Sequence, residues 1–263
     1  QNARIEGADI RVVYSPTDAV NLARKNASRP VIFLGVGFET TAPGVAVSIL
    51  EANEQRLDNY FVFCLHKFTP PAMQAMLDAG EVRLSGILGP GHVTTVIGTD
   101  AWRFLPEDFH IPIAVAGFEP VDILRGISML VNQISEGLAR VDNAYSRVIL
   151  PQGNWAALAV MNQVFEPCDA EWRGLAKISK SGMRIRDEYA GFDASKVFQV
   201  TARSTDAPSG CKCGEVLRGI LSPLQCPLFH RTCNPENPLG PCMVSAEGAC
   251  AAYHQFGDKS FED

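Results

Sequence analysis

The amino-acid sequence predicts an α/β protein that ends in a small cysteine-rich region. Short apolar runs alternate with helical patterns through the first 165 residues, separated by Gly- or Pro-marked loops, as in parallel βαβ units. Six of the eight cysteines lie between residues 211 and 250, in a stretch rich in Pro and Gly. No apolar run approaches the roughly 18 residues that a membrane-spanning helix needs. The chain is therefore expected to bury a core of its own.

Each apolar run is expected to form a strand and to lead into a helix. Ser15-Pro16-Thr17-Asp18 is a typical helix start. The expected strands are residues 9–14, 31–34, 60–64, 85–88, 111–115 and 147–150. The expected helices are residues 19–25, 42–53, a segment with Met73, Met76 and Leu77, a segment after His92, residues 121–137 and residues 155–165.

These elements are expected to form two doubly wound, Rossmann-like lobes, the first of them incomplete. Residues 30–140 contain four strand–helix repeats and are assigned to the second lobe. Residues 1–29 and 141–205 are assigned to the remainder of the first lobe. Pro208-Ser209-Gly210 marks the boundary of the cysteine-rich region, which is expected to span residues 206–263.

Charge and the start of the chain restrict the class of protein. The formal net charge is −6, so the basic face that nucleic-acid binding needs is not expected. The chain starts at Gln1, without an initiator Met or a signal-peptide pattern, and we expect it to be a fragment that lacks a leading segment. Without an export signal, cysteines crowded into one short region favour metal or redox chemistry over a secreted disulfide scaffold.

The cysteine-rich region is expected to hold an iron–sulfur cluster. A [4Fe-4S] cluster needs four thiolates supplied from sharply turning loops, and the prolines and glycines between the cysteines provide such turns. One selection of four ligands is Cys213, Cys226, Cys233 and Cys250. It leaves Cys211 and Cys242 over as a possible dithiol or disulfide pair. Zinc and plain disulfides are the alternatives, but zinc ribbons usually contain two close Cys-x2–4-Cys pairs, and none occurs here.

Candidate cleft residues follow two of the expected strands. Glu39, Thr40 and Thr41 lie where a strand gives way to a helix, and ligands of open α/β sheets gather beyond the carboxyl ends of strands. Glu39 is a candidate acid, base or hydrogen-bond acceptor, whereas the threonines are equally explained as helix caps. His92 lies at another such turn, although a lone His is more often structural, and His66 is interpreted in the same way. A nucleotide site is not expected, because neither a P-loop nor Gly-x-Gly-x-x-Gly occurs.

Several motifs together resemble the HypD family of hydrogenase maturation factors, and the resemblance runs from about Ala8 to Tyr253. In the α/β part they are Gly35-Val-Gly-Phe-Glu-Thr-Thr41, Gly89-Pro-Gly-His-Val93, Val96-Ile-Gly98, Ala116-Gly-Phe-Glu-Pro120 and Glu171-Trp-Arg-Gly174. In the cysteine-rich region they are Cys213-Gly-Glu-Val-Leu217, Cys226-Pro-Leu-Phe229 and Met243-Val-Ser-Ala-Glu-Gly-Ala-Cys-Ala-Ala252, which form the most specific part of the match.

The resemblance implies a cytoplasmic factor that helps to assemble the Fe(CN)2CO unit of [NiFe] hydrogenases. It implies two partner proteins: HypC, which shares the iron-bearing scaffold, and HypE, which delivers cyanide. It also implies two α/β lobes and a C-terminal [4Fe-4S] region similar to ferredoxin:thioredoxin reductase. By the family pattern, the cluster ligands fall on Cys213, Cys226, Cys233 and Cys250. Cys211 and Cys242 then resemble a redox pair that passes electrons from the cluster to the assembly site.

The sequence departs from the family pattern in one respect. The motifs Cys-Gly-x-His-x-His and Gly-Pro-x-Cys-Pro-x-Cys, near which the family holds its scaffold iron, do not occur here. The scaffold-iron Cys is therefore expected in a missing segment. The residues expected to line the cleft facing that segment are Glu39, Thr40, Thr41 and His92.

These features favour an assembly factor with redox chemistry over a free-standing enzyme. One alternative is a reductase with a cluster and a cofactor in the α/β cleft, against which the missing dinucleotide fingerprint argues. The other alternative is an α/β binding protein with a structural zinc site.

Overall fold

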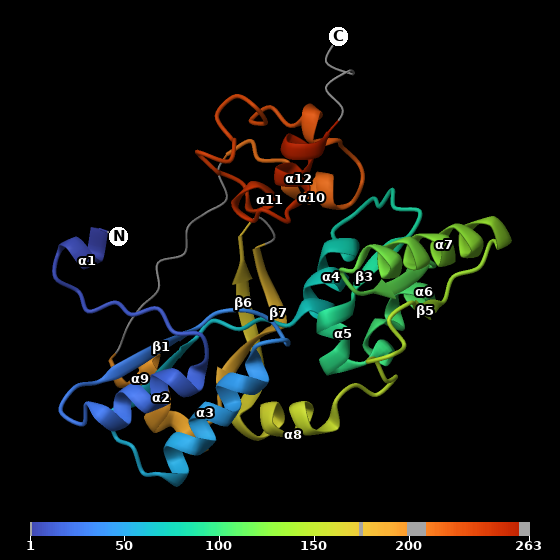
Figure 1. Cartoon of the computed structure of the whole chain (residues 1–263). Coiled ribbons are helices and arrows are strands. Elements are labelled where there is room, and N and C mark those ends of the chain that lie inside the picture. Colours follow the sequence, from blue (N-terminus) through green and yellow to red (C-terminus); the bar gives the residue numbers. More distant parts are fainter. Residues whose placement is uncertain (1, 174–175, 199–208, 258–263) are drawn as a thin grey trace. The chain divides into compact units, whose positions relative to one another are not determined.

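The computed structural model describes residues 2–173, 176–198 and 209–257, and its architecture is mixed α/β with parallel sheets (Figure 1). The chain divides into two compact units. Unit 1 comprises Gln1–Lys67, Trp155–Pro167 and Met183–Thr201. Unit 2 comprises Phe68–Asn154, Cys168–Gly182 and Ala202–Asp263.

Unit 1 is built around two parallel strands, β1 and β2. Val31 of β1 lies opposite Tyr60 of β2, and Gly35 lies opposite Cys64. The elements that lie wholly in this unit are α1 (Asn2–Ile5), α2 (Pro16–Lys25), β1 (Val31–Gly35), α3 (Ala42–Glu54), β2 (Tyr60–Cys64), α8 (Trp155–Val164), the 3-10 helix η2 (Asp187–Phe192) and α9 (Ala194–Val197).

Local sequence explains how these elements are fixed. α2 begins with a capping box, in which the Ser15 hydroxyl accepts a hydrogen bond from the Asp18 N–H and the Asp18 carboxylate accepts one from the Ser15 N–H. Pro16 occupies the first turn of α2, where its missing N–H costs nothing. The side-chain amide of buried Asn59 donates to three carbonyls, those of Ala23, Asn26 and Arg29, and so ties the end of α2 to the start of β2.

Unit 2 contains a three-stranded parallel sheet of order β3-β4-β5, in which the central strand β4 is buried along its whole length. Its core packs around Trp102, which is fully buried and donates through its indole N–H to the Thr94 hydroxyl at 2.9 Å. The elements are α4 (Thr69–Asp78), β3 (Ile87–Pro90), α5 (Gly91–Ile97), η1 (Thr99–Trp102), α6 (Phe104–Asp108), β4 (Ile113–Ala116), α7 (Pro120–Glu136) and β5 (Val141–Asn143).

The cysteine-rich region of unit 2 consists of short helices joined by turns. Its elements are α10 (Cys213–Leu217), η3 (Pro223–Gln225), α11 (Pro241–Val244) and α12 (Ala249–Phe256). The small core of this region is formed largely by five buried cysteines with Phe229, Met243 and Ala251. The expected start of the region, residues 206–208, lies outside the described residues.

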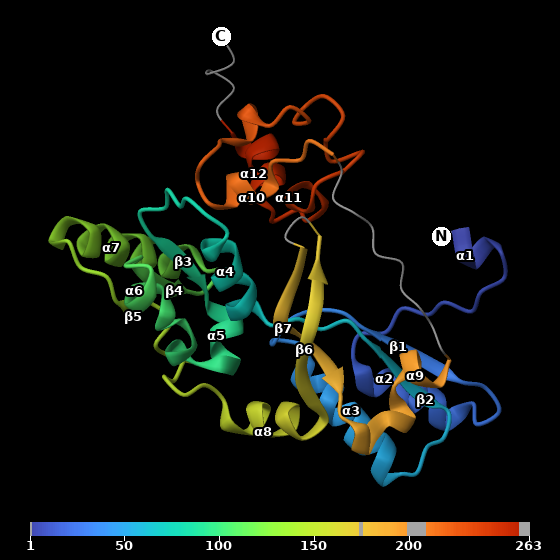
Figure 2. The same cartoon turned by 180° about the vertical axis from the view of Figure 1, so that it is seen from behind.

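A second pair of strands, β6 (Phe165–Trp172) and β7 (Ala176–Ile185), was not expected from the sequence. The two strands pair with each other and lie side by side in Figures 1 and 2. The boundary between the two units crosses both of them. Along β6 half-buried and exposed residues alternate, but the half-buried set includes Glu166 and the exposed set includes Pro167, so the apolar period-2 signal of a strand was hidden.

Two expected strands are not formed within the described residues. Residues 9–13 run without a ladder partner, although their apolar alternation is typical of a strand. Residues 147–150 continue a turn in which the N–H groups of Val148 and Ile149 both donate to the Tyr145 carbonyl. The expected strands near β1, β2, β3 and β4 and the expected helices near α2, α3, α4, α5, α7 and α8 are confirmed.

The compact units separate at Lys67 and Asn154. Within the described residues, β1 pairs with β2, whereas β3, β4 and β5 form another sheet. The division into lobes that the sequence predicts, with residues 30–140 as one lobe, stays a prediction. Among the described residues, no helix has both the length and the hydrophobicity that crossing a membrane requires.

Candidate functional site

All six cysteines of the C-terminal region line one small cavity. Cys213, Cys242 and Cys250 lie in the short helices α10, α11 and α12, Cys226 and Cys233 lie in turns between α10 and α11, and Cys211 precedes α10. Five of the six are at most 9% exposed, and Cys211 is half-buried. The cavity is lined by Cys211, Cys213, Cys226, Cys233, Cys242 and Cys250, with Leu228, Phe229, Gly240 and Met243. Its lining is therefore entirely sulfur, apolar carbon and one glycine, without a carboxylate or an imidazole.

The structure joins Cys213, not Cys211, to Cys242 in a disulfide. This corrects the expected pairing of Cys211 with Cys242. Cys213 is the first residue of α10 and turns into the core of the region, whereas Cys211 lies two residues before the helix and stays half-buried. The thiols that remain in this cavity are those of Cys211, Cys226, Cys233 and Cys250.

Burial opposes ionisation of two of these thiols, those of Cys211 and Cys250. Burial, with smaller contributions from the neighbouring Cys226, Cys233 and Cys211, raises the pKa of Cys250 to about 11. The pKa of Cys211 is also raised, mainly by burial, although the backbone N–H of Cys213 acts in the opposite direction. The thiols of Cys211 and Cys250 are therefore held in the protonated form at pH 7. A bound metal reverses this preference, because a coordinating thiol is deprotonated outright.

Within the described residues, no set of three or more His, Cys, Asp or Glu side chains is arranged to hold a single metal ion. The free space in the cavity is about 10 Å³, room for about one water molecule. The donor set nevertheless has the chemistry that an iron–sulfur cluster requires, four soft thiol ligands in an apolar and turn-rich surrounding. A cluster distributes its ligands over four irons, so these side chains would have to separate to receive one.

A second group of candidate residues lies in unit 1, beyond the carboxyl ends of β1 and β2. Glu39 is fully buried, whereas Thr40 and Thr41 are exposed. The Thr41 hydroxyl donates to the Phe38 carbonyl at 3.3 Å and lies 3.2 Å from Nε2 of His66. Thr41 makes no side-chain cap to α3, so the capping role considered for it is wrong.

His66 fixes this loop from inside the unit. It is 2% exposed, and burial lowers its pKa to about 4, so its ring is neutral at pH 7. Nδ1 of His66 lies 3.7 Å from the sulfur of Cys64, which also lies 3.3 Å from the Met183 carbonyl. From the sequence, His66 was interpreted as more often structural than functional, and the structure places it as the buried support of the Glu39–Thr41 loop.

The fourth cleft candidate, His92, belongs to unit 2 and is exposed. Its ring packs edge-to-face on Phe118, with 4.8 Å between ring centroids. Glu39, Thr40 and Thr41 belong to unit 1, so the structure divides the four expected cleft residues between the two units. Their meeting in one cleft stays a prediction.

Close to His92, the structure shows an ion-pair network that the sequence analysis missed. Arg147 donates to both carboxylate oxygens of Asp122, at 2.7 and 2.6 Å, and to Glu119 at 3.0 Å. Hydrogen bonding from Arg147 lowers the pKa of Asp122, whose side chain is 3% exposed. The Arg147 guanidinium also lies 4.4 Å above the Tyr145 ring. The network fixes the loop after β4. Of its residues, the sequence analysis named only Glu119, as part of the Gly117-Phe118-Glu119 motif.

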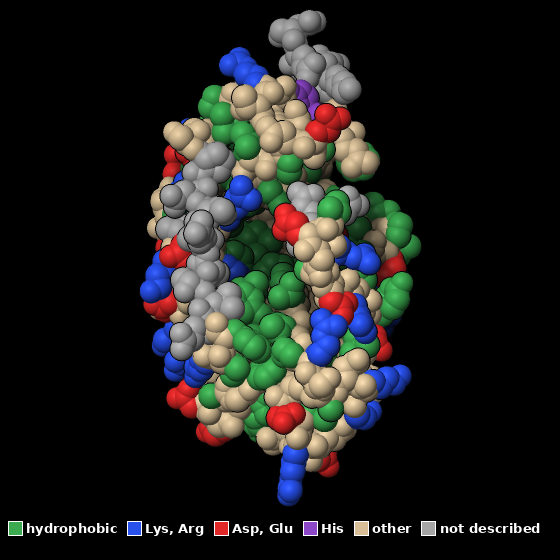
Figure 3. Space-filling model, turned by 90° about the vertical axis from the view of Figure 1, so that its left-hand side faces the viewer, with side chains coloured by type: hydrophobic (Ala, Val, Ile, Leu, Met, Phe, Trp, Pro, Cys, Tyr) green, Lys and Arg blue, Asp and Glu red, His purple; other side chains and the backbone are tan. Residues whose placement is uncertain are grey.

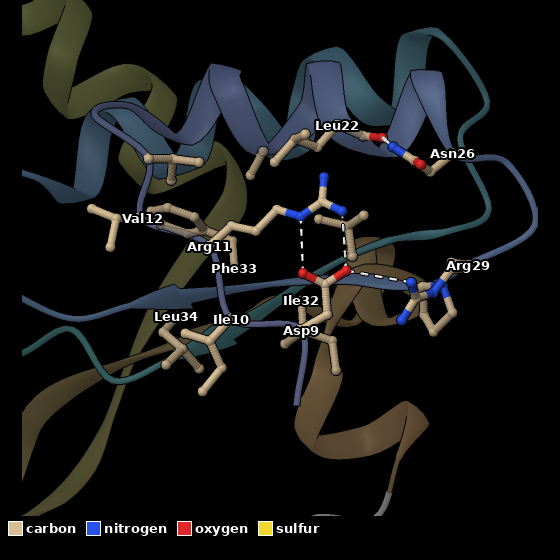
Figure 4. Close-up of a pocket in the computed structure, with 14 residues that line it drawn as sticks. Asp9, Ile10, Arg11, Val12, Leu22, Asn26, Arg29, Ile32, Phe33 and Leu34 are labelled. Carbon is tan, nitrogen blue, oxygen red and sulfur yellow. Dashed lines mark hydrogen bonds and ion pairs between the residues drawn. The ribbon is translucent and has the colours of Figure 1, made fainter. Parts of the chain in front are cut away.

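A pocket of unit 1 lies between residues 9–13, α2 and the edge of β1 that points away from β2 (Figure 4). Its volume is about 650 Å³. Asp9 lies in its wall, where its carboxylate accepts hydrogen bonds from two guanidinium nitrogens of Arg11 at 3.0 Å and from Arg29 at 3.3 Å. The N–H of Val31 and the carbonyl of Gly35 form hydrogen bonds on the β2 side of the strand. Because the backbone groups of successive strand residues point to opposite sides, those of Ile32 and Leu34 point to the pocket. The face drawn in Figure 3 carries a gathering of hydrophobic side chains.

Comparison with known proteins gives a consistent result over nearly the whole chain. Residues 1–257 match the model of the HypD family, described as the hydrogenase formation hypA family. The chain is 46% identical to the hydrogenase maturation factor HypD of Azotobacter vinelandii over 261 residues, which are 97% of this chain and 69% of that protein. It is 43% identical to the HypD protein of Escherichia coli (strain K12), over 99% of this chain and 70% of that protein. The chain belongs to the HypD family of hydrogenase maturation factors.

Proposed function

We propose that this chain acts in hydrogenase maturation as a scaffold and redox component for assembly of the Fe(CN)2CO unit, with HypC and HypE as partners in the cytoplasm. The observation that carries the redox part is the convergence of six cysteines on one cavity, two of them joined and four as thiols. The four thiols match the ligand number of a [4Fe-4S] cluster. The iron that receives cyanide and carbon monoxide is the cargo of this process, and no residue of this chain is assigned to it.

We propose that the cluster ligands are Cys211, Cys226, Cys233 and Cys250. Cys211 replaces the expected Cys213 because the sulfur of Cys213 is bonded to Cys242. When bound, a cluster of this kind supplies one-electron redox chemistry. Reduction of the Cys213–Cys242 disulfide to two thiols would consume two electrons and two protons, so a one-electron cluster would pass on two electrons in succession, each drawn from an external one-electron donor. Both sulfurs line the same cavity as the four proposed ligands, so the two redox groups are neighbours in this chain.

Anaerobic purification, assays of iron and acid-labile sulfide, and optical absorption test the cluster. Cys226→Ala is expected to abolish the brown chromophore, and Cys242→Ala is expected to leave it. The pair Cys211→Ala and Cys213→Ala distinguishes the two ligand sets: only the first should lose iron. A colourless wild-type protein with stoichiometric zinc would refute the cluster, and retained colour in Cys226→Ala would refute the ligand set.

The partner proposal has a separate test. HypC and HypE are each mixed with this protein, and an affinity tag on one protein is used to purify the complex. A stable complex is expected whichever protein carries the tag. Failure of both to associate would contradict the scaffold role without affecting the cluster.

We also infer that the β1–β2 sheet is part of a larger, Rossmann-like sheet in family members. The support is the pocket beside β1, onto which the backbone N–H groups of Ile32 and Leu34 point, and the lack of a ladder partner for the described residues 9–13. Such an edge is a template for further strands. This chain spans 69% of the length of its Azotobacter vinelandii relative, so such a protein has additional sequence to supply them. Amide exchange at Ile32 and Leu34 is expected to be fast in this chain and slow in the longer relative.

A further inference from the structure

Within unit 2, the cysteine-rich region is docked on the loop between α4 and β3, residues 79–86. The N–H of Arg83 donates to the Arg218 carbonyl at 2.8 Å, and Nη1 of Arg218 lies 3.5 Å from the Glu81 carbonyl. Gly219 lies against the same loop, because a Cβ at this position would lie 2.6 Å from the Arg83 carbonyl oxygen. Its φ of +72° is also one that residues with a side chain rarely adopt. The chain that follows α10 therefore fits closely against this loop.

α10 connects this docking contact to the Cys213–Cys242 disulfide. Cys213 is the first residue of the helix, and Arg218 directly follows its last residue, Leu217. A helix of five residues is not stable by itself, so the position of α10 depends on what holds its two ends. One end is held by the disulfide, and the other end is held by the contact with Arg83.

Of the two helices that the disulfide joins, α11 is held more firmly than α10. Met243 of α11 is buried, and Gly248 lies so close to α11 that a Cβ there would overlap the Cys242 carbonyl. On α10, a Cβ at Gly214 would meet no atom within 4 Å. Reduction replaces the S–S bond by a longer van der Waals contact, and the free space in the cavity is only about 10 Å³. The sulfurs can therefore separate only if a helix moves, and α10 has the room to do so.

We propose that the Cys213–Cys242 disulfide is a redox switch for this docking. Its reduction shifts α10 and loosens the contact between Arg218 and Arg83. A dithiol supplies the two electrons and two protons, so that its own S–S bond forms as the Cys213–Cys242 bond breaks and both cysteines become thiols. Because coupling between two sites is reciprocal, a weaker docking contact must in turn make the disulfide easier to reduce. The switch depends on the disulfide and the loop alone, so loss of the proposed cluster would leave it standing.

Amide hydrogen exchange of the purified chain under anaerobic conditions, followed by NMR, tests the switch directly. The Arg83 N–H is expected to exchange at least about 10-fold faster after reduction with dithiothreitol. The Ile113 N–H, which donates to the Arg140 carbonyl in the three-stranded sheet, should not change. The double variant Cys213→Ser/Cys242→Ser should exchange at the reduced rate with or without dithiothreitol. An Arg83 rate that does not depend on the oxidation state, or a purified chain without the Cys213–Cys242 link, would overturn the proposal.

Gly219→Ala tests the reciprocal effect. It places a Cβ against the Arg83 carbonyl, so the equilibrium constant for reduction of the disulfide by dithiothreitol should rise at least about 5-fold. Gly137→Ala is the matched control, because Gly137 has a similar φ of +65° at the end of α7, where a Cβ would meet no atom within 4 Å. Thiol labelling of the Cys213 and Cys242 peptides, read by mass spectrometry, measures the equilibrium, and circular dichroism checks that both variants stay folded. An unchanged equilibrium in Gly219→Ala, or an equal rise in Gly137→Ala, would contradict the coupling.

Discussion

The sheet core around Trp102 and the core of the cysteine-rich region are both buried, but they are built from different kinds of side chain. The core around Trp102 contains aliphatic and aromatic residues from helices and parallel strands. The cysteine-rich region has helices of three to eight residues, too short to be stable alone, and its core is mainly sulfur. The first core is stabilised by area removed from water, whereas the second depends on the Cys213–Cys242 disulfide and, by our proposal, on cluster ligation by the other four cysteines. Substitutions in the two regions should therefore fail in different ways.

The largest effect is expected from Trp102→Ala. The change removes a fully buried indole and its hydrogen bond to Thr94, and it should lower the free energy of unfolding by about 4 kcal/mol. Urea denaturation followed by circular dichroism measures this loss. Trp155→Ala is the control, since Trp155 is 81% exposed, and an equal loss in both variants would contradict the argument from burial.

Cys242→Ser should act on the cysteine-rich region and leave the core around Trp102 unchanged. The Cys213–Cys242 disulfide joins residues 29 apart in sequence, and closing a loop of that size contributes about 3–4 kcal/mol in the chain-entropy model. Hydrogen exchange and limited proteolysis should show faster opening of residues 211–250 and unchanged protection around Trp102. Loss of protection in both regions would show that they unfold together and would remove the distinction drawn above.

The stability of unit 1 should fall in mild acid because of His66. The folded state binds the His66 proton more weakly than the unfolded state, because burial lowers the pKa from 6.5 to about 4. The stability that neutral His66 provides is therefore present above pH 6.5 and is lost as the pH falls toward 4, about 2 kcal/mol of it by pH 5. Urea denaturation at pH 7.5 and pH 5 measures the loss. His66→Asn should remove this pH dependence, whereas substitution of exposed His92 by Asn should keep it.

The smallest effect is expected from Ser48→Ala. The Ser48 hydroxyl lies 2.8 Å from the Tyr60 hydroxyl, and both residues are fully buried, so the change leaves the phenol without this partner. A cost of about 1 kcal/mol is expected from the lost hydrogen bond. Ser28→Ala, at an exposed position, is the control. No difference between the two variants in urea denaturation would show that the Tyr60 hydroxyl finds another partner.

Local pattern predicted most of the α/β elements. Ser15 and Asp18 form the capping box that the helix-start signal indicated, and the apolar run at Tyr60–Cys64 is a buried strand. Residues 9–13 have an equally strand-like pattern but lack a partner, because pairing depends on which segments are near one another in space. β6 and β7 were not predicted, because polar residues interrupt the alternation of apolar side chains in their sequences.

The sequence by itself determined the family, the mixed α/β class and the crowding of six cysteines into one region, because motifs, periodicity and spacing are local properties. Only the tertiary structure decided which cysteine meets Cys242, that His66 supports the Glu39–Thr41 loop, and that β1 and β3 belong to different sheets. Cys211 and Cys213 are two residues apart and have the same chemistry. The fold of α10 turns Cys213 toward the core of the region, and the direction of that side chain is set by packing.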